Sequence, residues 1–404
     1  MSLRFAKLQD KKDIEDLLAY CFADMRPDLE RRRAEEAAGT APAETAAQLR
    51  AREENLQWVL LKEEDDGKIS QHVQIVPHTI HFDGNLYKMG GIGGVASWPE
   101  YRYGGGVAQL LRWSLELMRE RGCIFSELAP FSFAFYRKYG WEWGFRWQEL
   151  TIPMKELARF KGDTGHFVPL GKEHRAEAIR VRNVHGSRFN GAEWQDPDSG
   201  AEDFPPKKRT AYGVRNEAGA LEGYVTFHLE ADQLRCRDFF YVNHAAKRKL
   251  LHFFHRHNAQ ASAVRLTVPE HDTLPMLLED AYVPTRSPAG MMVRVVDVPA
   301  ALNAMRLSPS VSGQLVMKVL DEAAPWNEGN WLVQAEGGRL GATRVEDREP
   351  DCVVSIQRLS QLVYGFLSGA DANAADMVEW RQEAAQPLFC DMFRARPTAQ
   401  WIPF

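Results

Sequence analysis

The sequence predicts an α/β protein of three domains, and three observations carry this prediction. The chain has 404 residues, with apolar and charged fractions of 45% and 26% that are typical of soluble globular proteins. Strand-like and helix-like segments alternate over residues 1–152, and nearly the same order returns over 153–290. Residues 291–404 instead show several strands followed by helices. We therefore expect two related domains with mixed sheets covered by helices, and a smaller C-terminal α+β domain.

The first predicted domain, residues 1–152, begins with a strand and a helix. Asp10 is suited to cap that helix, and Asp83-Gly84 between two strand-like runs is a strong hairpin signal. Residues 27–54 are rich in Glu, Arg and Ala and predict a solvated helical excursion. The predicted strands cover 3–8, 56–63, 71–82, 85–97, 123–128 and 143–152, and two further helices run from 107 to near 122 and over 131–139.

The remaining two domains follow from the same periodicities. In the second domain the predicted strands cover 209–215, 221–230, 233–242 and 263–269, and the helices 172–187, 245–257 and 273–278. The third domain is expected to begin at 291–302, with strands over 313–320, 329–335, 340–345 and 352–356, and helices over 357–367, 370–379 and 382–389.

Composition narrows the classes of function. The net charge of −5 gives no sign of a nucleic-acid partner. No run of about 18 apolar residues predicts a membrane span, and the first residues lack the apolar core of a signal peptide. Five scattered cysteines without a Cys-x-x-Cys pair favour reduced thiols in the cytoplasm and no metal site.

A glycine-rich loop between a strand and a helix is the most informative segment. Residues 94–106 read Gly-Val-Ala-Ser-Trp-Pro-Glu-Tyr-Arg-Tyr-Gly-Gly-Gly, and apolar residues at helical spacing follow from Val107. A helix N-terminus offers unpaired N–H groups and a dipole that favours negative charge, and glycines let a ligand approach the backbone. The loop therefore predicts a phosphate or pyrophosphate site; a plain turn before an ordinary helix is the alternative.

The second domain lacks this loop. Its corresponding junction, residues 242–248, reads Val-Asn-His-Ala-Ala-Lys-Arg and contains no glycine. We therefore expect a degenerate copy that binds no pyrophosphate. Lys247 and Arg248 could still meet a phosphate, although lysines at a helix start are usually only solvated.

An aromatic segment, Phe135-Tyr-Arg-Lys-Tyr-Gly-Trp141, follows the first domain's fifth strand. The Tyr136 hydroxyl is protonated at neutral pH and can donate a proton to a departing thiolate. Core packing is the alternative, because aromatic residues crowd this segment, and Tyr139 is a rival for the same role.

Taken together, Arg102-x-x-Gly105, the strand before it and the Tyr136 segment resemble the acyl-coenzyme A motif of the Gcn5-related N-acetyltransferase (GNAT) superfamily. The resemblance implies acetyl-coenzyme A as co-substrate, with Tyr136 facing the thioester sulfur. Val107 departs from the superfamily pattern, which prefers Gly or Ala there, and Gly104 and Gly106 are expected to compensate. The implied cofactor-binding residues are Val95, Ala96 and Ser97 for the pantetheine arm, and Arg102, Tyr103, Gly104, Gly105 and Gly106 for the pyrophosphate.

Over the whole chain, two such domains and the Val-Val-Asp-Val-Pro run at 295–299 resemble the enhanced intracellular survival (Eis) family of acetyltransferases. That resemblance implies a sterol carrier protein-like third domain, a hexamer, and acetylation of amines, aminoglycosides included. It also implies that the α-carboxylate of Phe404 accepts the proton. Phe22, Asp24 and Trp141 are the expected substrate contacts, and Pro403 departs from the family, which tends to carry an acid there.

Two alternatives stay open at this point. His81 and Glu127 are other possible bases, although neither stands out by motif. The chain could instead be a lipid or small-molecule binding protein, if a third-domain tunnel exists. Its possible lining is Leu359, Leu362, Val363, Phe366 and Leu367, which fit core packing equally well.

Overall fold

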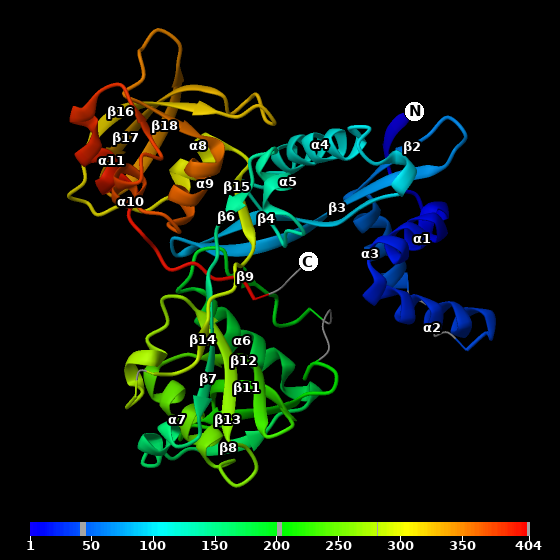
Figure 1. The fold of residues 1–404 in the computed structure, drawn as a ribbon, viewed down its shortest axis with the longest axis vertical. Helices are drawn as coiled ribbons and strands as arrows, with labels where there is room; N and C mark the ends of the chain where they lie inside the picture. The colour runs from blue at the N-terminus through cyan, green and yellow to red at the C-terminus, as the bar shows by residue number, and fades with distance from the viewer. Residues whose placement is uncertain (41–45, 200–203, 281, 402–404) are drawn as a thin grey trace.

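The computed structural model describes residues 1–40, 46–199, 204–280 and 282–401, which form three sheets covered by helices (Figure 1). The sheets have eight, seven and five strands. Each sheet has at least one parallel strand pair among antiparallel ones. The predicted α/β class, with two related domains and a third α+β domain, is confirmed.

The first sheet has the order β1-β2-β3-β4-β5-β15-β6, with β9 also paired to β3. Alternate residues of β2 point to opposite faces: Leu60 packs in the cluster that includes α4 and α5, whereas Val59 and Leu61 pack with α1. Two further helices, α2 and α3, lie beyond α1 in Figure 1. The strands are β1 (Ser2–Phe5), β2 (Val59–Glu63), β3 (Ile69–Phe82), β4 (Asn85–Ser97), β5 (Phe125–Leu128), β6 (Glu142–Trp143), β9 (Glu193–Trp194) and β15 (Met292–Val295). The helices are α1 (Lys11–Cys21), α2 (Arg26–Ala37), α3 (Ala46–Leu56), α4 (Gly106–Glu120) and α5 (Phe133–Arg137).

Two predicted segments contribute strands to sheets other than those expected from the sequence. The single closing strand expected over 143–152 is two strands, of which β6 stays in the first sheet and β7 (Trp147–Pro153) joins the second. The segment expected to open the third domain is β15, which lies between β5 and β6. Alternating patterns reveal a strand but not its sheet, because pairing partners are chosen in three dimensions. The domain boundaries expected at residues 152 and 290 stay predictions, because strands near both positions join the sheet of another domain.

The second sheet repeats the architecture of the first, with the order β14-β7-β13-β12-β11-β10-β8. Its predicted elements are observed within two residues at most ends, and Leu221–Glu230 and Ala263–Pro269 match fully. The remaining strands are β8 (His166–Pro169), β10 (Thr210–Arg215), β11 (Leu221–Glu230), β12 (Gln233–Tyr241), β13 (Ala263–Pro269) and β14 (Thr285–Arg286), with helices α6 (Arg175–Gly186) and α7 (His244–His255).

The third sheet has the order β18-β17-β16-β19-β20 and packs against α8 to α11 (Figure 1). Leu359, Leu362 and Val363 are fully buried in its core, so the lipid-carrier alternative gains no support from this packing. The strands are β16 (Gly313–Leu320), β17 (Gly329–Glu336), β18 (Arg339–Val345), β19 (Cys352–Ser355) and β20 (Glu379–Trp380), and the helices are α8 (Val298–Ala304), α9 (Ile356–Tyr364), α10 (Gly369–Ala374) and α11 (Gln386–Met392).

The C-terminal segment, residues 393–401, leaves the third domain and runs to β9, where the first two domains meet (Figure 1). Asn190 holds it on both sides, donating its N–H to the Pro397 carbonyl at 2.9 Å and accepting from the Ala399 N–H at 3.2 Å. The Trp401 ring packs against second-domain aromatics, including Phe240 at 5.2 Å between centroids. Residues 397–401 are thus docked between the domains.

Candidate active site

Strands β4 and β5 separate at one end of the first sheet. Their parallel pairing ends at Ile92 and Leu128, while β4 continues to Ser97. A bulge forms at this point, with Gly94 in the left-handed region at φ +57°. The buried His72 ring donates from Nδ1 to the Gly94 carbonyl at 2.6 Å, and burial lowers the pKa of His72 to about 4. A neutral imidazole therefore fixes the bulge that opens the sheet.

The N-terminus of α4 lies at the end of this opening and is left uncapped by side chains. Gly105 takes the N-cap position at φ +76°, and no side chain of the described residues caps the first turn. A Cβ added at Gly105 would meet nothing within 4 Å, and one at Gly104 only the Tyr101 carbonyl at 3.6 Å. At Gly106 it would lie 1.8 Å from Oε1 of Gln71. The loop thus offers open space and free backbone donors, which suits a pyrophosphate.

Side chains of β3 hold this loop in place. Gln71 donates from Nε2 to the Ser97 hydroxyl at 3.2 Å and to the Tyr101 carbonyl at 3.0 Å. Arg102 donates from Nε to the Ser97 carbonyl at 3.3 Å, and Tyr103 is fully exposed at φ +66°. The sequence motif revealed Arg102 and the glycines but gave no hint of Gln71, because its role depends on strand pairing.

The second domain shows the opposite arrangement at the start of α7. Asn243 caps this helix by accepting from the Ala246 N–H at 2.8 Å. Lys247, expected to be solvated, is instead buried and pairs with Asp272 at 2.6 Å, and Arg248 pairs with Asp163. An occupied helix terminus with neutralised cations is poorly suited to a phosphate.

Tyr136 lies in α5 and is almost fully buried. It belongs to the same apolar cluster as Ile92 and Leu128, the last paired residues before the strands separate, and Val95 packs against this cluster. Burial raises the pKa of Tyr136, so its phenol stays protonated and can act as a donor but not as a base. Tyr139 is also buried in this cluster.

The glycine and tryptophan that follow have packing functions. A Cβ at Gly140 would lie 1.8 Å from Nη1 of Arg294, a fully buried residue of β15 that pairs with Asp321. Trp141 is fully buried, with its Nε1 donating to the Ser126 hydroxyl at 3.2 Å and its ring 5.5 Å from the Arg294 guanidinium. The expectation that Trp141 contacts substrate stays a prediction. Its burial instead favours a role in packing beside Tyr136.

The end of α1 reaches the same opening from the opposite face of the sheet. Cys21 lies 3.6 Å, Sγ to oxygen, from the Ser97 carbonyl, and the rings of Tyr20 and Trp98 are 5.0 Å apart. Phe22, half-buried, and Asp24, exposed, follow directly. These two predicted substrate contacts therefore flank the opening.

The last predicted catalytic residue, Phe404, lies outside the described residues. The nearby Gln400 is described, and its Nε2 donates to Oε2 of Glu127 at 2.9 Å and to the Gly191 carbonyl at 3.0 Å. No sequence motif singles out Glu127. A carboxylate within the short buried strand Phe125–Leu128 is nevertheless an unusual feature that could have indicated it. The other candidate base, His81, has a pKa lowered by burial.

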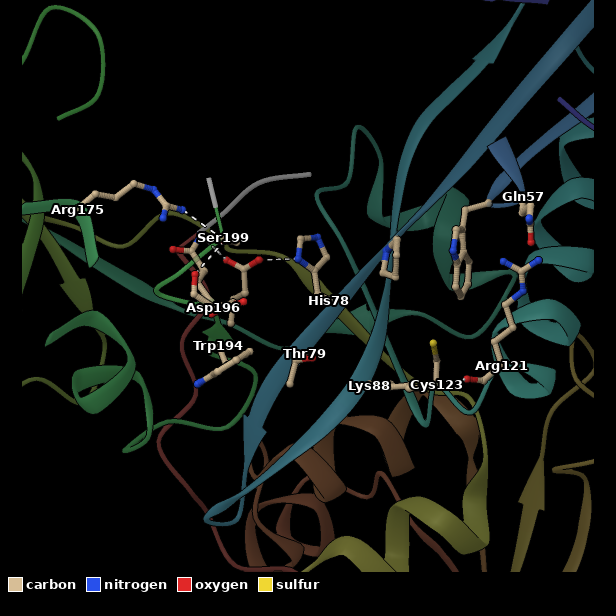
Figure 2. Close-up of a pocket in the computed structure, with 14 residues that line it drawn as sticks. Gln57, His78, Thr79, Lys88, Arg121, Cys123, Arg175, Trp194, Asp196 and Ser199 are labelled. Atoms are coloured by element: carbon tan, nitrogen blue, oxygen red, sulfur yellow. Dashed lines mark hydrogen bonds and ion pairs between the residues drawn. The ribbon is translucent and has the colours of Figure 1, made fainter. Parts of the chain in front are cut away.

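A cavity of about 870 Å³ lies along the free edge of β3, between the start of β2 and β9 (Figure 2). Figure 2 shows its lining in two groups, with Gln57 and Arg121 on one side and Arg175 and Asp196 on the other. None of the predicted site residues that the structure describes lines it. Along β3, the cavity residue His78 pairs with Met89, whereas Gln71 pairs with Ser97, so the cavity and the strand opening lie at different ends of the strands.

Three protein families match successive parts of the chain. Residues 2–144 and 190–295 each match an acetyltransferase (GNAT) domain, and residues 298–398 match a sterol carrier protein domain. The fold and these matches together define a chain with two acetyltransferase (GNAT) domains followed by a sterol carrier protein-like domain. Domains of the GNAT type use acetyl-coenzyme A.

Individual relatives share a stretch of the sequence or the fold of this chain. A protein of Streptomyces avermitilis described as an uncharacterized N-acetyltransferase is 34% identical over 112 residues, which cover 28% of this chain and 26% of that protein. The fold matches a probable N-acyltransferase from Enterococcus faecalis over 100% of this chain and 99% of the other, with a TM-score of 0.82 and 21% identity. It also matches Eis1 from Mycobacterium abscessus over 100% of both chains, with a TM-score of 0.77 and 17% identity.

Proposed function

We propose that this protein is an acetyl-coenzyme A-dependent N-acetyltransferase of the Eis type. It would transfer acetyl to primary amines, at one or several positions, of a cationic small molecule such as an aminoglycoside-like compound or a polyamine. The observation that carries the proposal is the uncapped N-terminus of α4 at the opening between β4 and β5. The capped α7 gives the second domain no such feature, which supports one transfer site in each chain.

Acetyl-coenzyme A supplies the acetyl group when it is bound. Arg102 and the backbone N–H groups of residues 103–106 would hold the pyrophosphate, because cations and free helix N-terminal donors both favour an anion. Val95, Ala96 and Ser97 form the part of β4 that no longer pairs with β5 and would receive the pantetheine arm. Open space at Gly104 and Gly105 agrees with this placement.

Four events complete the reaction. The amine nitrogen attacks the thioester carbonyl carbon, the C–S bond breaks, Tyr136 donates a proton to the departing thiolate, and the α-carboxylate of Phe404 takes the proton that the ammonium loses. An α-carboxyl group has an ordinary pKa of about 3.5, so this role requires surroundings that raise it.

Chain length is compatible with this base. Gln400 bonds to Glu127, which pairs with Gly91, and Val95 lies four residues further along β4. Four strand residues span about 13 Å. The four residues that follow Gln400 can span at most about 14 Å, so the C-terminus can reach the opening.

Recognition of the acceptor would use the end of α1. Asp24 is exposed beside the opening and would attract a cationic amine, while Phe22 would provide an aromatic contact. Trp141 would support this recognition indirectly, because its ring packs against the Tyr136 ring.

We also propose that the protein forms a homo-oligomer, a hexamer by its likeness to the Eis family, and that it is located in the cytoplasm. A sedimentation experiment would test the oligomeric state, and cell fractionation would test the location. Within the described residues, no helix is long and apolar enough to cross a membrane.

Release of free thiol from acetyl-coenzyme A, measured with a panel of aminoglycosides and polyamines, tests the function. We expect turnover with cationic amines and saturable binding of acetyl-coenzyme A in calorimetry. No thiol release with any amine, together with no binding of acetyl-coenzyme A, would overturn the proposal.

Deletion of Phe404 tests the base, because it moves the terminal carboxylate back by one residue. We expect turnover to fall by roughly 10²–10⁴-fold, the usual contribution of acid–base catalysis. Phe404→Leu is the matched control, since it keeps the carboxylate in place and changes only the ring. Full activity of the shortened chain would remove the carboxylate from the mechanism.

A further inference from the structure

A buried carboxyl group lies where all three domains meet. Glu127 is in β5 of the first domain, and its Oε1 accepts from the Tyr364 hydroxyl of the third domain at 3.1 Å. Its Oε2 accepts from Nε2 of Gln400 in the C-terminal segment at 2.9 Å. The second domain approaches at Gly191, where an added Cβ would lie 3.1 Å from Glu127 Oε1. One side chain therefore bonds to the third domain and to Gln400 of the C-terminal segment, and it lies beside Gly191 of the second domain.

Burial of this carboxyl group has an unfavourable desolvation free energy. The pKa of Glu127 is raised to about 8, first by desolvation and to a smaller extent by the nearby Glu193 carboxylate, while the hydrogen bonds from Gln400 and Tyr364 act in the opposite direction. Among the described residues, none of those that shift the pKa of Glu127 is a cation. An apolar side chain of similar size would cost less free energy to bury in the core. Packing alone therefore does not explain a glutamate at this position.

The position of Glu127 relates it to the opening between the strands. Glu127 directly precedes Leu128, the last β5 residue paired before β4 and β5 separate. Gln400 is held between Glu127 and the Gly191 carbonyl, and the Ala399 N–H is bonded to the Asn190 carbonyl at 3.2 Å. The C-terminal segment is thus fixed at the inner end of the opening, four residues before the chain ends.

We propose that Glu127, held in place by the Tyr364 hydroxyl, is a positioning residue of the transfer site: through Gln400 it fixes the C-terminal segment so that the terminal carboxylate meets the reacting amine. The inference rests on the proposed function, in which the carboxylate of Phe404 takes the proton. Glu127 touches no reacting atom, and its effect on turnover passes entirely through the C-terminal segment.

A double-mutant cycle between Gln400 and the end of the chain tests this role. Gln400→Ala is expected to lower kcat by roughly 10–100-fold in the full chain, because a displacement of about 1 Å at a reacting group has that effect. In a chain that lacks Phe404 the same substitution should lower kcat less than twofold, since the group that it positions is already displaced. The KM for acetyl-coenzyme A should not change in either background.

The control is Gln361→Ala, which removes another buried amide at a domain boundary. Gln361 donates from Nε2 to the Trp143 carbonyl at 2.8 Å and joins the third domain to the first without bonding to the C-terminal segment. It should show equal effects in the two backgrounds, as a purely structural substitution would. Glu127→Gln and Tyr364→Phe should act as Gln400→Ala does, with a smaller loss for Tyr364→Phe, which keeps the ring.

Hydrogen exchange of residues 395–401 provides a readout that is independent of activity. Exchange in this segment should rise in Gln400→Ala and Glu127→Gln and stay unchanged in Gln361→Ala. Unchanged exchange, or an equal loss of kcat with and without Phe404, would overturn the positioning role and leave the proposed function intact. Full activity of the chain without Phe404 would instead overturn the proposed base and the positioning role with it.

Discussion

At the scale of single residues, the glycines of the two motifs serve different purposes. Gly105 has a positive φ and open space beside it, which suits a ligand-binding loop. Gly106 and Gly140 are required for packing, because Gln71 and the buried Arg294 occupy the space where a side chain would be. A sequence pattern shows that a glycine is present but not which of these reasons applies, since the neighbour comes from a distant strand.

Tyr136 and Tyr139 can be separated by a matched pair of substitutions. Tyr136→Phe removes the buried hydroxyl and should lower kcat by roughly 10²–10⁴-fold, because no donor remains for the departing thiolate. Tyr139→Phe should change kcat less than about threefold. Initial rates at saturating acetyl-coenzyme A measure both effects. Similar kcat values for Tyr136→Phe and the unsubstituted protein would show that Tyr136 only packs the core.

At the scale of elements, α4 and α7 show how a repeated fold loses a ligand site. The two helices begin at equivalent places, but α4 starts with an uncapped glycine and α7 with the capping residue Asn243. In α7, Lys247 is neutralised by Asp272. The absence of glycines predicted this difference, whereas the buried ion pair came to light only in the structure.

The cofactor role of the α4 loop is tested by comparing one arginine from each repeat. Arg102→Ala should weaken acetyl-coenzyme A binding roughly 10-fold, through loss of a charge-assisted contact with phosphate. Arg248→Ala should leave the affinity unchanged, because Arg248 is already paired with Asp163. Calorimetric titration with acetyl-coenzyme A measures both. Equal weakening in the two variants would argue against a site confined to the first domain.

At the scale of the whole molecule, exchanged strands and the C-terminal segment hold the three domains together. The first sheet receives β9 and β15 from later parts of the chain, and the second sheet receives β7. Helix α9 adds a contact through Gln357, whose Nε2 donates to the Arg137 carbonyl at 2.8 Å beside Tyr136. The proposed transfer site of the first domain is therefore supported by residues from all three domains.

Glu127 should make the stability of this arrangement depend on pH. Its pKa is about 8 when folded and 4.5 ordinarily, so the folded state binds an extra proton between these values. The free energy of unfolding should therefore decrease as pH rises from about 4.5 to 8. The lowered pKa values of His72 and His185, about 4 for each, act in the opposite direction, but only below pH 6.5. Between pH 6.5 and 8.5, Glu127 should contribute a loss of at most about 2 kcal/mol.

Calorimetric unfolding at pH 6.5 and 8.5 measures this contribution. Glu127→Gln removes the titrating group and keeps the side-chain shape, so its melting temperature should fall less between the two pH values than that of the unsubstituted protein. Equal falls in the two proteins would contradict the assignment of the pH dependence to Glu127.

Local patterns in the sequence predicted most of the elements, the repeat and the glycine-rich loop before α4, because periodicity, turn residues and glycines act over short stretches of chain. Strand limits such as Asn85–Ser97 followed directly from these patterns. The sheets that β7, β9 and β15 join, and the partners that Gln71, Arg294 and Glu127 meet, depend on the three-dimensional fold. These contacts join residues tens to hundreds of positions apart, and no local pattern encodes the partner of a buried polar group.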